Sequence, residues 1–246
     1  MRSYNQYCSM ARALDLVGDR WTLLIVRELL TQNACRFSDL RRGLPGIASN
    51  LLADRLRDMD AAGIVERTQE PPPVAATLIR LTDRGQDLAG VVRELTRWGA
   101  PLMFDPASES GAAAEDAPAF RMHWFLLPLR YLARDNTPDE PPVVVRFGDV
   151  YDGCDVTIGV GDGADDQNRN DDQNRTDDGR GNNGSGQVAV APSSSGVQPD
   201  TTVTGPGPAV VRMVTGLISV ADAPGHGITI DGNPRSIERL LPGGMP

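Results

Sequence analysis

The sequence predicts a mainly α-helical N-terminal domain over residues 1–104 and a smaller α+β C-terminal domain over residues 119–246. Three observations lead to this division. Apolar residues recur at helical spacing through most of the first domain. Residues 105–118, DPASESGAAAEDAP, read as an acidic linker of small residues. Beyond the linker, apolar residues also alternate with polar ones, which predicts strands as well as helices.

Two helices are predicted near the N-terminus. Apolar residues at i, i+3, i+4 and i+7 indicate the first helix over residues 7–17. Gly18 interrupts this pattern, and Asp19 is a suitable N-cap for a second helix over residues 20–30. The second helix is apolar on nearly every side, so we expect it at the centre of a small core.

A pair of helices joined by a short turn comes next. FSDLRRGL, residues 37–44, predicts a third helix that starts near Ser38 and is broken by Pro45 and Gly46. Ser49 is predicted to cap a fourth helix, NLLADRLRDMDAAG. Two helices joined by a short glycine-containing turn form a helix-turn-helix unit.

A hairpin and a last helix complete the first domain. Residues 64–82 are predicted to form two strands around a proline-rich tip, and residues 84–103 a final amphipathic helix. The order helix, helix, helix, turn, helix, hairpin, helix is that of a winged helix-turn-helix domain. The sequence therefore predicts this fold for residues 1–104.

The fourth helix separates an apolar side from a polar side. At about 100° per residue, the apolar side consists of Leu52, Leu56 and Met59. The opposite side carries Asn50, Asp54 and Arg57, with Arg55 on its flank. Because an amide and a guanidinium can hydrogen-bond base edges in the major groove, we predict that this helix reads DNA. Asp54 repels phosphate, so we expect it to contact a base or to orient an arginine.

Other predicted DNA contacts surround this helix. They are basic and hydroxyl residues on the preceding helix, at the turn and on the hairpin: Arg36, Ser38, Arg41, Arg42, Ser49, Arg67 and Arg80. Arginines neutralise phosphates and fix the position of a protein on a duplex. The alternative interpretation is that these charges form an ordinary solvated surface.

The charge distribution is compatible with a DNA partner for the first domain alone. The net charge is −9, and all 24 basic residues are arginine. Residues 1–104 hold 14 Arg against 12 Asp and Glu, whereas the remainder holds 10 against 21. The negative total argues against a nucleic-acid partner, but the first domain is slightly positive.

Residues 5–104 resemble the HxlR-type winged helix-turn-helix regulators of bacteria. The motifs that carry the resemblance are Cys8 before the first helix, Gly-x-x-Trp at 18–21, Phe-x-Asp-Leu at 37–40 and Trp-Gly at 98–99. The resemblance implies a homodimeric transcription factor whose first and last helices form the dimer interface. It assigns dimerisation to Met10, Leu14, Leu88, Val92 and Leu95. Periodicity alone equally allows these residues to belong to the core of a single domain.

Cys8 is a candidate redox sensor, because in some members of this family a cysteine at this point senses oxidants or electrophiles. A helix N-terminus favours the thiolate, and Arg12 follows one turn later. Ser9, however, stands where the family usually has proline. The alternative is that Cys8 is a small buried apolar residue.

The C-terminal domain is predicted from less regular patterns. Residues 120–133 suggest a helix kinked at Pro128, and residues 143–158 suggest strands. Residues 209–223 read as a strand and the start of a helix, and residues 227–244 as strand, turn and helix. The closing segment is similar to that of sterol-carrier-protein-like domains, which enclose an apolar ligand tunnel. This similarity suggests an apolar effector; a filled core that serves assembly is the alternative.

The segment from about 161 to 208 is predicted to be a disordered, low-complexity insertion with the repeat DDQNR. Asp166, Asn168 and Asn170 have the spacing of a calcium loop, but Asp171 occupies the position that requires glycine. We therefore expect no calcium site there.

The sequence gives little support for an enzymatic function. The three cysteines have no zinc spacing, and the two histidines, His123 and His226, lie far apart without a nucleophile motif. We expect no catalysis, no metal and no cofactor. Without a signal peptide or an apolar run of about 20 residues, a cytoplasmic location is expected. The predicted function is sequence-specific transcriptional regulation; the alternative is a lipid- or acyl-binding protein whose winged domain mediates protein contacts.

Overall fold

The computed structural model describes residues 3–71, 75–104, 119–148, 153–159 and 188–240. The chain divides into two compact units, Met1–Ala119 and Phe120–Pro246. They are called unit 1 and unit 2.

Unit 1 begins with four helices. They are α1 (Ser9–Val17), α2 (Thr22–Gln32), α3 (Phe37–Gly43) and α4 (Ser49–Ala61). Strand β1 (Ala34–Cys35) lies between α2 and α3. Asp19 accepts a hydrogen bond from the backbone N–H of Trp21 at 3.0 Å, just before α2. The four helices confirm the order that the sequence predicts for this part of the chain.

Helix α2 forms the centre of the unit 1 core, where Ile25, Val26 and Leu29 have no exposed surface. The buried side of α2 also contains a carboxylate, which the apolar sequence pattern of this helix does not indicate. Glu28 is fully buried, and its Oε1 accepts from Arg27 Nη2 at 2.7 Å. No room remains for a Cβ at Gly43 of α3, because the Glu28 carboxylate lies against it. Glycine at position 43 therefore allows α3 to lie against the buried carboxylate of α2.

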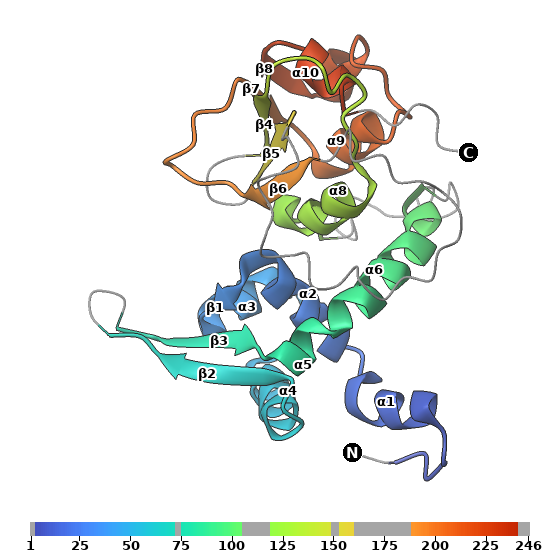
Figure 1. Ribbon diagram of the computed structural model, residues 1–246, viewed down its shortest axis with the longest axis vertical. Coiled ribbons are helices and arrows are strands. Elements are labelled where there is room, and N and C mark those ends of the chain that lie inside the picture. The colour runs from blue at the N-terminus through green and yellow to red at the C-terminus, as the bar shows by residue number, and fades with distance from the viewer. Residues whose placement is uncertain (1–2, 72–74, 105–118, 149–152, 160–187, 241–246) are drawn as a thin grey trace. The chain divides into compact units, whose positions relative to one another are not determined.

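The hairpin consists of β2 (Val65–Gln69) and β3 (Thr77–Leu81), paired antiparallel from Val65 opposite Leu81 to Gln69 opposite Thr77. Strand β1 pairs with the other side of β3, which gives the sheet order β1-β3-β2. Figure 1 shows the hairpin projecting away from helices α2, α3 and α4. This arrangement is a wing beside a helix-turn-helix, as the sequence predicts.

The single last helix that the sequence predicts is divided in the structure. Its parts are α5 (Asp83–Gln86), α6 (Leu88–Gly99) and a 3-10 turn (Ala100–Phe104). The Thr82 hydroxyl caps α5 by accepting from Gly85 N–H at 3.1 Å, and it also donates to the Gly63 carbonyl. These bonds hold the start of α5 against the end of α4, and α6 begins after the break at Asp87.

Unit 2 contains a five-stranded sheet in the order β6-β5-β4-β7-β8. The strands are β4 (Val143–Phe147), β5 (Cys154–Ile158), β6 (Ala189–Pro192), β7 (Thr201–Thr204) and β8 (Thr229–Gly232). All neighbours are antiparallel except β4 and β7. The helices are α8 (Leu126–Leu132), α9 (Gly207–Val214) and α10 (Arg235–Glu238), with 3-10 turns at Met122–Phe125 and Ala223–His226. Unit 2 is thus α+β.

Three expectations for unit 2 are wrong in detail. Residues 207–214 form helix α9 rather than a strand, because Val210, Val211, Met213 and Val214 bury one helical side. Strands β6 and β7 lie inside the segment expected to be a disordered insertion; its residues 161–187 are outside the described residues. The single helix expected over residues 120–133 is a 3-10 turn, Met122–Phe125, followed by α8, and Pro128 stands in the first turn of α8.

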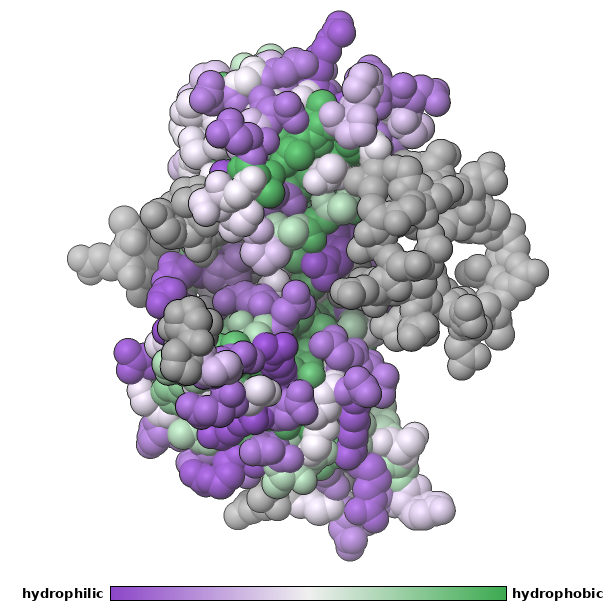
Figure 2. All heavy atoms as spheres, turned by 60° about the vertical axis from the view of Figure 1, so that its left-hand side comes forward, coloured by the Kyte–Doolittle hydropathy of each residue, from purple (hydrophilic) through white to green (hydrophobic). Residues whose placement is uncertain are grey.

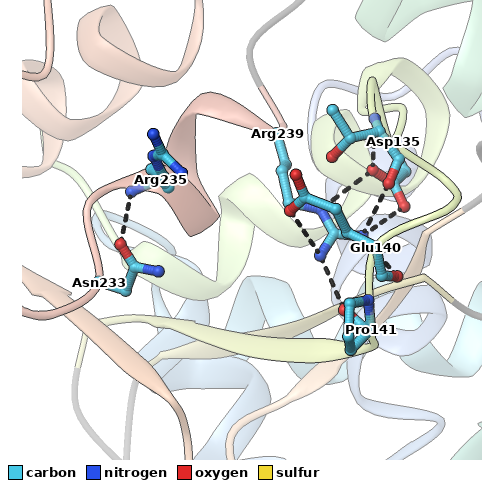
Figure 3. A network of polar contacts seen from close by, with 7 residues as sticks. Asp135, Glu140, Pro141, Asn233, Arg235 and Arg239 are labelled. Atoms are coloured by element: carbon cyan, nitrogen blue, oxygen red, sulfur yellow. Dashed lines mark hydrogen bonds and ion pairs between the residues drawn. The ribbon is translucent and has the colours of Figure 1, made fainter.

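Two buried arginines hold unit 2 together. Arg146 of β4 pairs with Asp155 of β5, its cross-strand neighbour, at 2.7 Å. Arg239, which follows α10, pairs with Asp135 at 2.8 Å and donates to the carbonyl oxygen of Pro141 at 2.8 Å. Figure 3 shows Arg239 surrounded by these acceptors. The end of the described chain is thereby fastened to the segment that leads into β4.

Candidate nucleic-acid interface

Helix α4 presents a polar outer side because its apolar side is anchored. Leu52, Leu56 and Met59 are at most 1% exposed, which confirms the burial that the helical spacing predicts. Asn50, Asp54 and Arg57 are exposed. Arg57 Nη2 lies 3.0 Å from Asp54 Oδ1, and these two side chains are 70% and 52% exposed. The outer side of α4 therefore offers an amide and a guanidinium whose direction is set by a carboxylate.

The start of α4 differs from the prediction. Ala48, not Ser49, occupies the N-cap position, and no side chain caps the helix there. Ser49 is the first helical residue, and its hydroxyl accepts from Arg41 Nη1 at 3.3 Å. This contact joins the end of α3 to the beginning of α4.

Helix α3 carries a second set of exposed polar residues. Asp39 lies among them, and its Oδ2 accepts from the backbone N–H of Arg36 at 3.2 Å. Its Oδ1 accepts from Arg42 Nη2 at 3.3 Å and from the Ser38 hydroxyl at 3.5 Å. Arg36, Ser38, Arg41 and Arg42 are all exposed. The helix-turn-helix thus displays hydrogen-bond donors from both helices.

Arg55 lies apart from the other candidates. Its side chain is only 18% exposed, and its guanidinium lies 3.1 Å from Asp58 and 3.6 Å from Asp19. Its Nε is buried and has no partner among the described residues. Arg55 ties α4 to the segment before α2, so the structure gives it a packing role where the sequence suggested a contact on the flank.

The wing supplies two further exposed arginines. Arg67 Nε lies 3.7 Å from Asp60 Oδ2, and Arg80 Nη2 lies 3.0 Å from Glu70 Oε1. Both arginine side chains are 45% exposed. Figure 2 is turned so that the hairpin side comes forward, and unit 1 is mostly hydrophilic in this view. The hairpin tip, residues 72–74, lies outside the described residues.

The five candidate dimer residues are not equally accessible. Met10, Leu14 and Leu95 are 69%, 38% and 48% exposed, and Leu88 is half-buried. Val92 is only 6% exposed and belongs to the core of its own chain. Sequence reasoning missed several exposed apolar residues on or beside the same helices: Tyr4, Tyr7, Val91, Trp98, Leu102 and Met103. The helical spacing of the last helix puts Val91 and Trp98 on its apolar side, but only the fold shows that these two side chains are uncovered.

The cysteines fall into two classes. Cys8 is exposed at the N-cap of α1. Cys35 and Cys154 are buried, and burial is the main reason that the pKa of each thiol rises to about 12. A thiol with such a pKa is almost entirely protonated at neutral pH, so of the three only Cys8 is placed to meet a reagent.

The remaining site predictions concern metals, histidines and membranes. Within the described part of the chain, no group of three or more His, Cys, Asp or Glu could hold a metal ion. The calcium-loop segment around Asp166 lies outside the described residues. His123 is half-buried with its ring 6.1 Å from that of Trp124, and His226 is exposed in a 3-10 turn. None of the described helices has the length and apolar character needed to cross a bilayer.

Comparison with known proteins finds relatives of unit 1. Residues 16–105 match the family described as HxlR-like helix-turn-helix. The uncharacterized HTH-type transcriptional regulator YvaP of Bacillus subtilis is 33% identical over 96 residues, which cover 39% of this chain and 87% of YvaP. An uncharacterized HTH-type transcriptional regulator of Mycobacterium tuberculosis is 41% identical over 91 residues, 37% of this chain and 56% of that protein.

Solved structures give the same kind of match. The reduced form of the transcriptional regulator YodB from Bacillus subtilis is 30% identical, with a TM-score of 0.35 over 38% of this chain and 92% of YodB. The family match ends at residue 105 and so does not include unit 2.

Proposed function

The chain belongs to the HxlR-like helix-turn-helix family, and from this membership we propose that it is a sequence-specific DNA-binding transcriptional regulator that acts as a homodimer. The observation that carries the proposal is the outer side of α4. Its apolar side is buried at Leu52 and Leu56, so Asn50 and Arg57 are left facing outward. In helix-turn-helix proteins the second helix enters the major groove.

The proposed roles of these residues, base contact or phosphate contact, follow from the chemistry of their side chains. Asn50 and Arg57 have the donors that read adenine and guanine edges in the major groove. Asp54 holds the Arg57 guanidinium at 3.0 Å and so limits the directions in which it can donate. The exposed arginines of α3 and of the wing contact phosphates, which fix the register of the protein on the duplex. Their residues are Arg36, Arg41, Arg42, Arg67 and Arg80.

The experiment that tests this proposal is selection of a preferred site from a random duplex library, followed by affinity measurements. With that site, Asn50→Ala and Arg57→Met are expected to lose about tenfold to a hundredfold in affinity, since one good bidentate base contact discriminates by that order. Arg235→Met in unit 2 removes the same charge from an exposed position and serves as the control. Full affinity in both α4 variants would refute the placement of the recognition side.

The homodimer proposal is supported by exposed apolar side chains. Nine of the twelve exposed large apolar residues among those described lie in residues 4–14 or 91–103. They include Trp98 at 75% exposure and Met10 at 69%. Soluble chains rarely leave such a concentration of apolar surface in water unless a partner covers it. A second copy of the chain placed against α1 and α6 would bring two α4 helices to one duplex, as two-fold symmetric operators require.

Sedimentation velocity tests the assembly. The unchanged chain is expected to sediment as a dimer, and Trp98→Glu as a monomer, because a charge at an apolar interface is unfavourable. Leu217→Glu is the matched control, since Leu217 is 59% exposed in unit 2. A dimer that survives Trp98→Glu together with Leu95→Glu would contradict the proposed interface.

Unit 2 is proposed to be an effector or interaction domain, with an apolar small molecule as the effector class. The support is its α+β architecture, in which α8 packs against β6 and the preceding 3-10 turn packs against β5. The ring centroids of Phe125, in that turn, and Phe147, on β4, lie 6.2 Å apart. Native mass spectrometry of the purified chain tests the idea. A co-purified apolar molecule that weakens or strengthens operator binding supports it, and a repeated bare protein mass contradicts it.

A further inference from the structure

Three of the arginines proposed to contact phosphates already hold a carboxylate of their own unit. The pairs and their N–O distances are Arg42 with Asp39 at 3.3 Å, Arg67 with Asp60 at 3.7 Å and Arg80 with Glu70 at 3.0 Å. The arginine side chains are 75%, 45% and 45% exposed. The pairs therefore lie at the surface, where a duplex can reach the guanidinium groups.

We propose that Asp39, Asp60 and Glu70 are built-in competitors of DNA phosphate, which weaken the binding of the protein to DNA of every sequence. The inference rests on the proposed function, because it requires these arginines to face the DNA backbone. It adds residues that the DNA-binding role alone does not require: carboxylates that oppose binding.

The competition follows from the chemistry of the guanidinium group. A carboxylate and a phosphate both accept charge-assisted hydrogen bonds from arginine, so each arginine must leave its carboxylate to bind DNA. The released carboxylate then lies near a phosphate of the same sign. Exposed ion pairs are weak, so the exchange can occur, but each one subtracts from the affinity.

Contact distance decides which carboxylates act in this way. At physiological ionic strength, charges in water are largely screened beyond about 8 Å. Acidic residues elsewhere in the chain therefore contribute little, although they dominate the net charge of −9. Only a carboxylate that lies against a DNA-facing arginine competes effectively.

The three competitors differ from Asp54 in what they do to specificity. Phosphate contacts carry no direct sequence information, so a penalty at these contacts is equal for the operator and for random DNA. Asp54 is paired with Arg57 on the side of α4 proposed to meet the bases. The competitors therefore shift both affinities together. By weakening non-specific binding, they reduce the fraction of the protein held at the large excess of non-specific genomic sites.

The test uses the full chain with Asp39→Asn, Asp60→Asn and Glu70→Gln, singly and combined. Affinity is measured by fluorescence anisotropy for the selected operator and for a random duplex of the same length, across a series of salt concentrations. Glu94→Gln is the control, because Glu94 pairs with Arg97 at 3.4 Å on α6 and its neutralisation changes the net charge equally. Circular dichroism and sedimentation establish that each variant is folded and assembled as before.

We expect each single variant to bind random DNA about threefold more tightly, in line with the strength of an exposed ion pair, and the triple variant about thirtyfold. The ratio of operator to random affinity should remain within twofold. The salt dependence should steepen, because a freed carboxylate in the unchanged protein attracts salt cations and offsets part of the counterion release from DNA. Glu94→Gln should change neither affinity.

Two results would overturn the inference. One is unchanged affinity of the triple variant for random DNA; the other is an equal gain for Glu94→Gln, which would indicate an effect of net charge alone. A double-mutant cycle sharpens the test: with Arg80→Met present, Glu70→Gln should lose its effect. If the unchanged protein selects no operator and its binding does not depend on Asn50 or Arg57, the proposed function fails instead, and the two failures are distinguished.

Discussion

The arginines of the candidate DNA interface in unit 1 and two buried arginines of unit 2 have opposite surroundings. In unit 1, the side chains of Arg42 and Arg57 are 75% and 70% exposed. In unit 2, those of Arg146 and Arg239 are 11% and 5% exposed. Each of the four has a carboxylate partner, so pairing alone does not distinguish them. The difference is whether water, and therefore a new partner, can reach the guanidinium group.

The partners also differ in how they are placed along the chain. Arg42 and Arg57 pair with carboxylates three residues earlier on their own helices. Arg239 pairs with Asp135 across 104 residues and also donates to backbone carbonyl groups. A local, exposed pair can open without disturbing the fold, whereas a distant, buried pair holds separate segments together. The comparison indicates that Arg42 and Arg57 of unit 1 are exchangeable and that Arg146 and Arg239 of unit 2 are architectural.

The largest expected effect is at Arg239. Arg239→Met should destabilise unit 2 by about 3–5 kcal/mol, because it leaves the Asp135 carboxylate buried without its partner. The loss of unfolding free energy is measured by urea unfolding, monitored through the fluorescence of Trp124. Trp21 and Trp98 are replaced by phenylalanine, so that the fluorescence reports on unit 2 alone. Arg42→Met in the same background is the control and should leave the transition unchanged. A loss below about 1 kcal/mol at Arg239 would remove the contrast between the units.

A smaller effect on the stability of unit 2 is expected when the pH is lowered. Burial opposes ionisation of Asp155, but hydrogen bonds from Arg146 and Ser193 prevail and hold the pKa of this carboxyl below its ordinary value of 3.8. A carboxyl whose pKa is lowered by folding stabilises the protein above the unfolded value. That stabilisation should be lost as the pH falls below 3.8 and through the lower folded pKa.

The urea midpoint of unit 2, measured from pH 6 to pH 2.5 with the same fluorescence reporter, checks the acid effect. Arg146→Met is the comparison variant, because it removes the main bond that lowers the Asp155 pKa. Its midpoint should be lower throughout and should fall less steeply below pH 3.8. Parallel curves for the two proteins would show that the Arg146–Asp155 pair does not carry the acid sensitivity.

The sequence predicts unit 1 well because its local signals agree with one another. The helices, the turn at Gly46 and the hairpin each have their own pattern. What the sequence does not give is the solvent exposure of individual side chains. Val92 and Trp98 occupy the same apolar stripe, yet one is 6% and the other 75% exposed. Arg55 and Arg57 are two residues apart, and only the fold shows that their side chains are 18% and 70% exposed.

Unit 2 is harder to predict because its contacts are distant in sequence. The β-branched run before Met213 favours a strand, but burial of four residues on one side makes it helix α9. Strand β7 is four residues long and lies in a polar segment, and its place beside β4 is fixed by a parallel pairing from Val145–Thr201 to Phe147–Val203. The arginine pairs are equally invisible, since nothing local connects Asp135 with Arg239.

Arg57 offers a sharper form of the comparison. Arg57→Met should change the free energy of unfolding of unit 1 by no more than about 0.5 kcal/mol, because an exposed pair on one helix contributes little. The same change is expected to weaken operator binding, so stability and affinity should separate at this residue. Leu56→Ala on the same helix is the contrast, with an expected loss of about 2–5 kcal/mol because Leu56 is 1% exposed. Urea unfolding, monitored by hydrogen exchange of peptides from α4, distinguishes the two variants.

The smallest predicted effect extends the comparison from arginines to thiols. Cys8 is exposed, whereas burial raises the pKa of Cys35 and Cys154 to about 12. Because the thiolate is the nucleophile, a disulfide reagent at pH 7.5 should modify one thiol per native chain and all three in urea. Cys8→Ser should abolish the native reaction. The thiol-sensing hypothesis is supported if modification of Cys8 weakens operator binding, while Cys8→Ser binds the operator normally with and without the reagent. Unchanged operator binding after complete modification of Cys8 contradicts it.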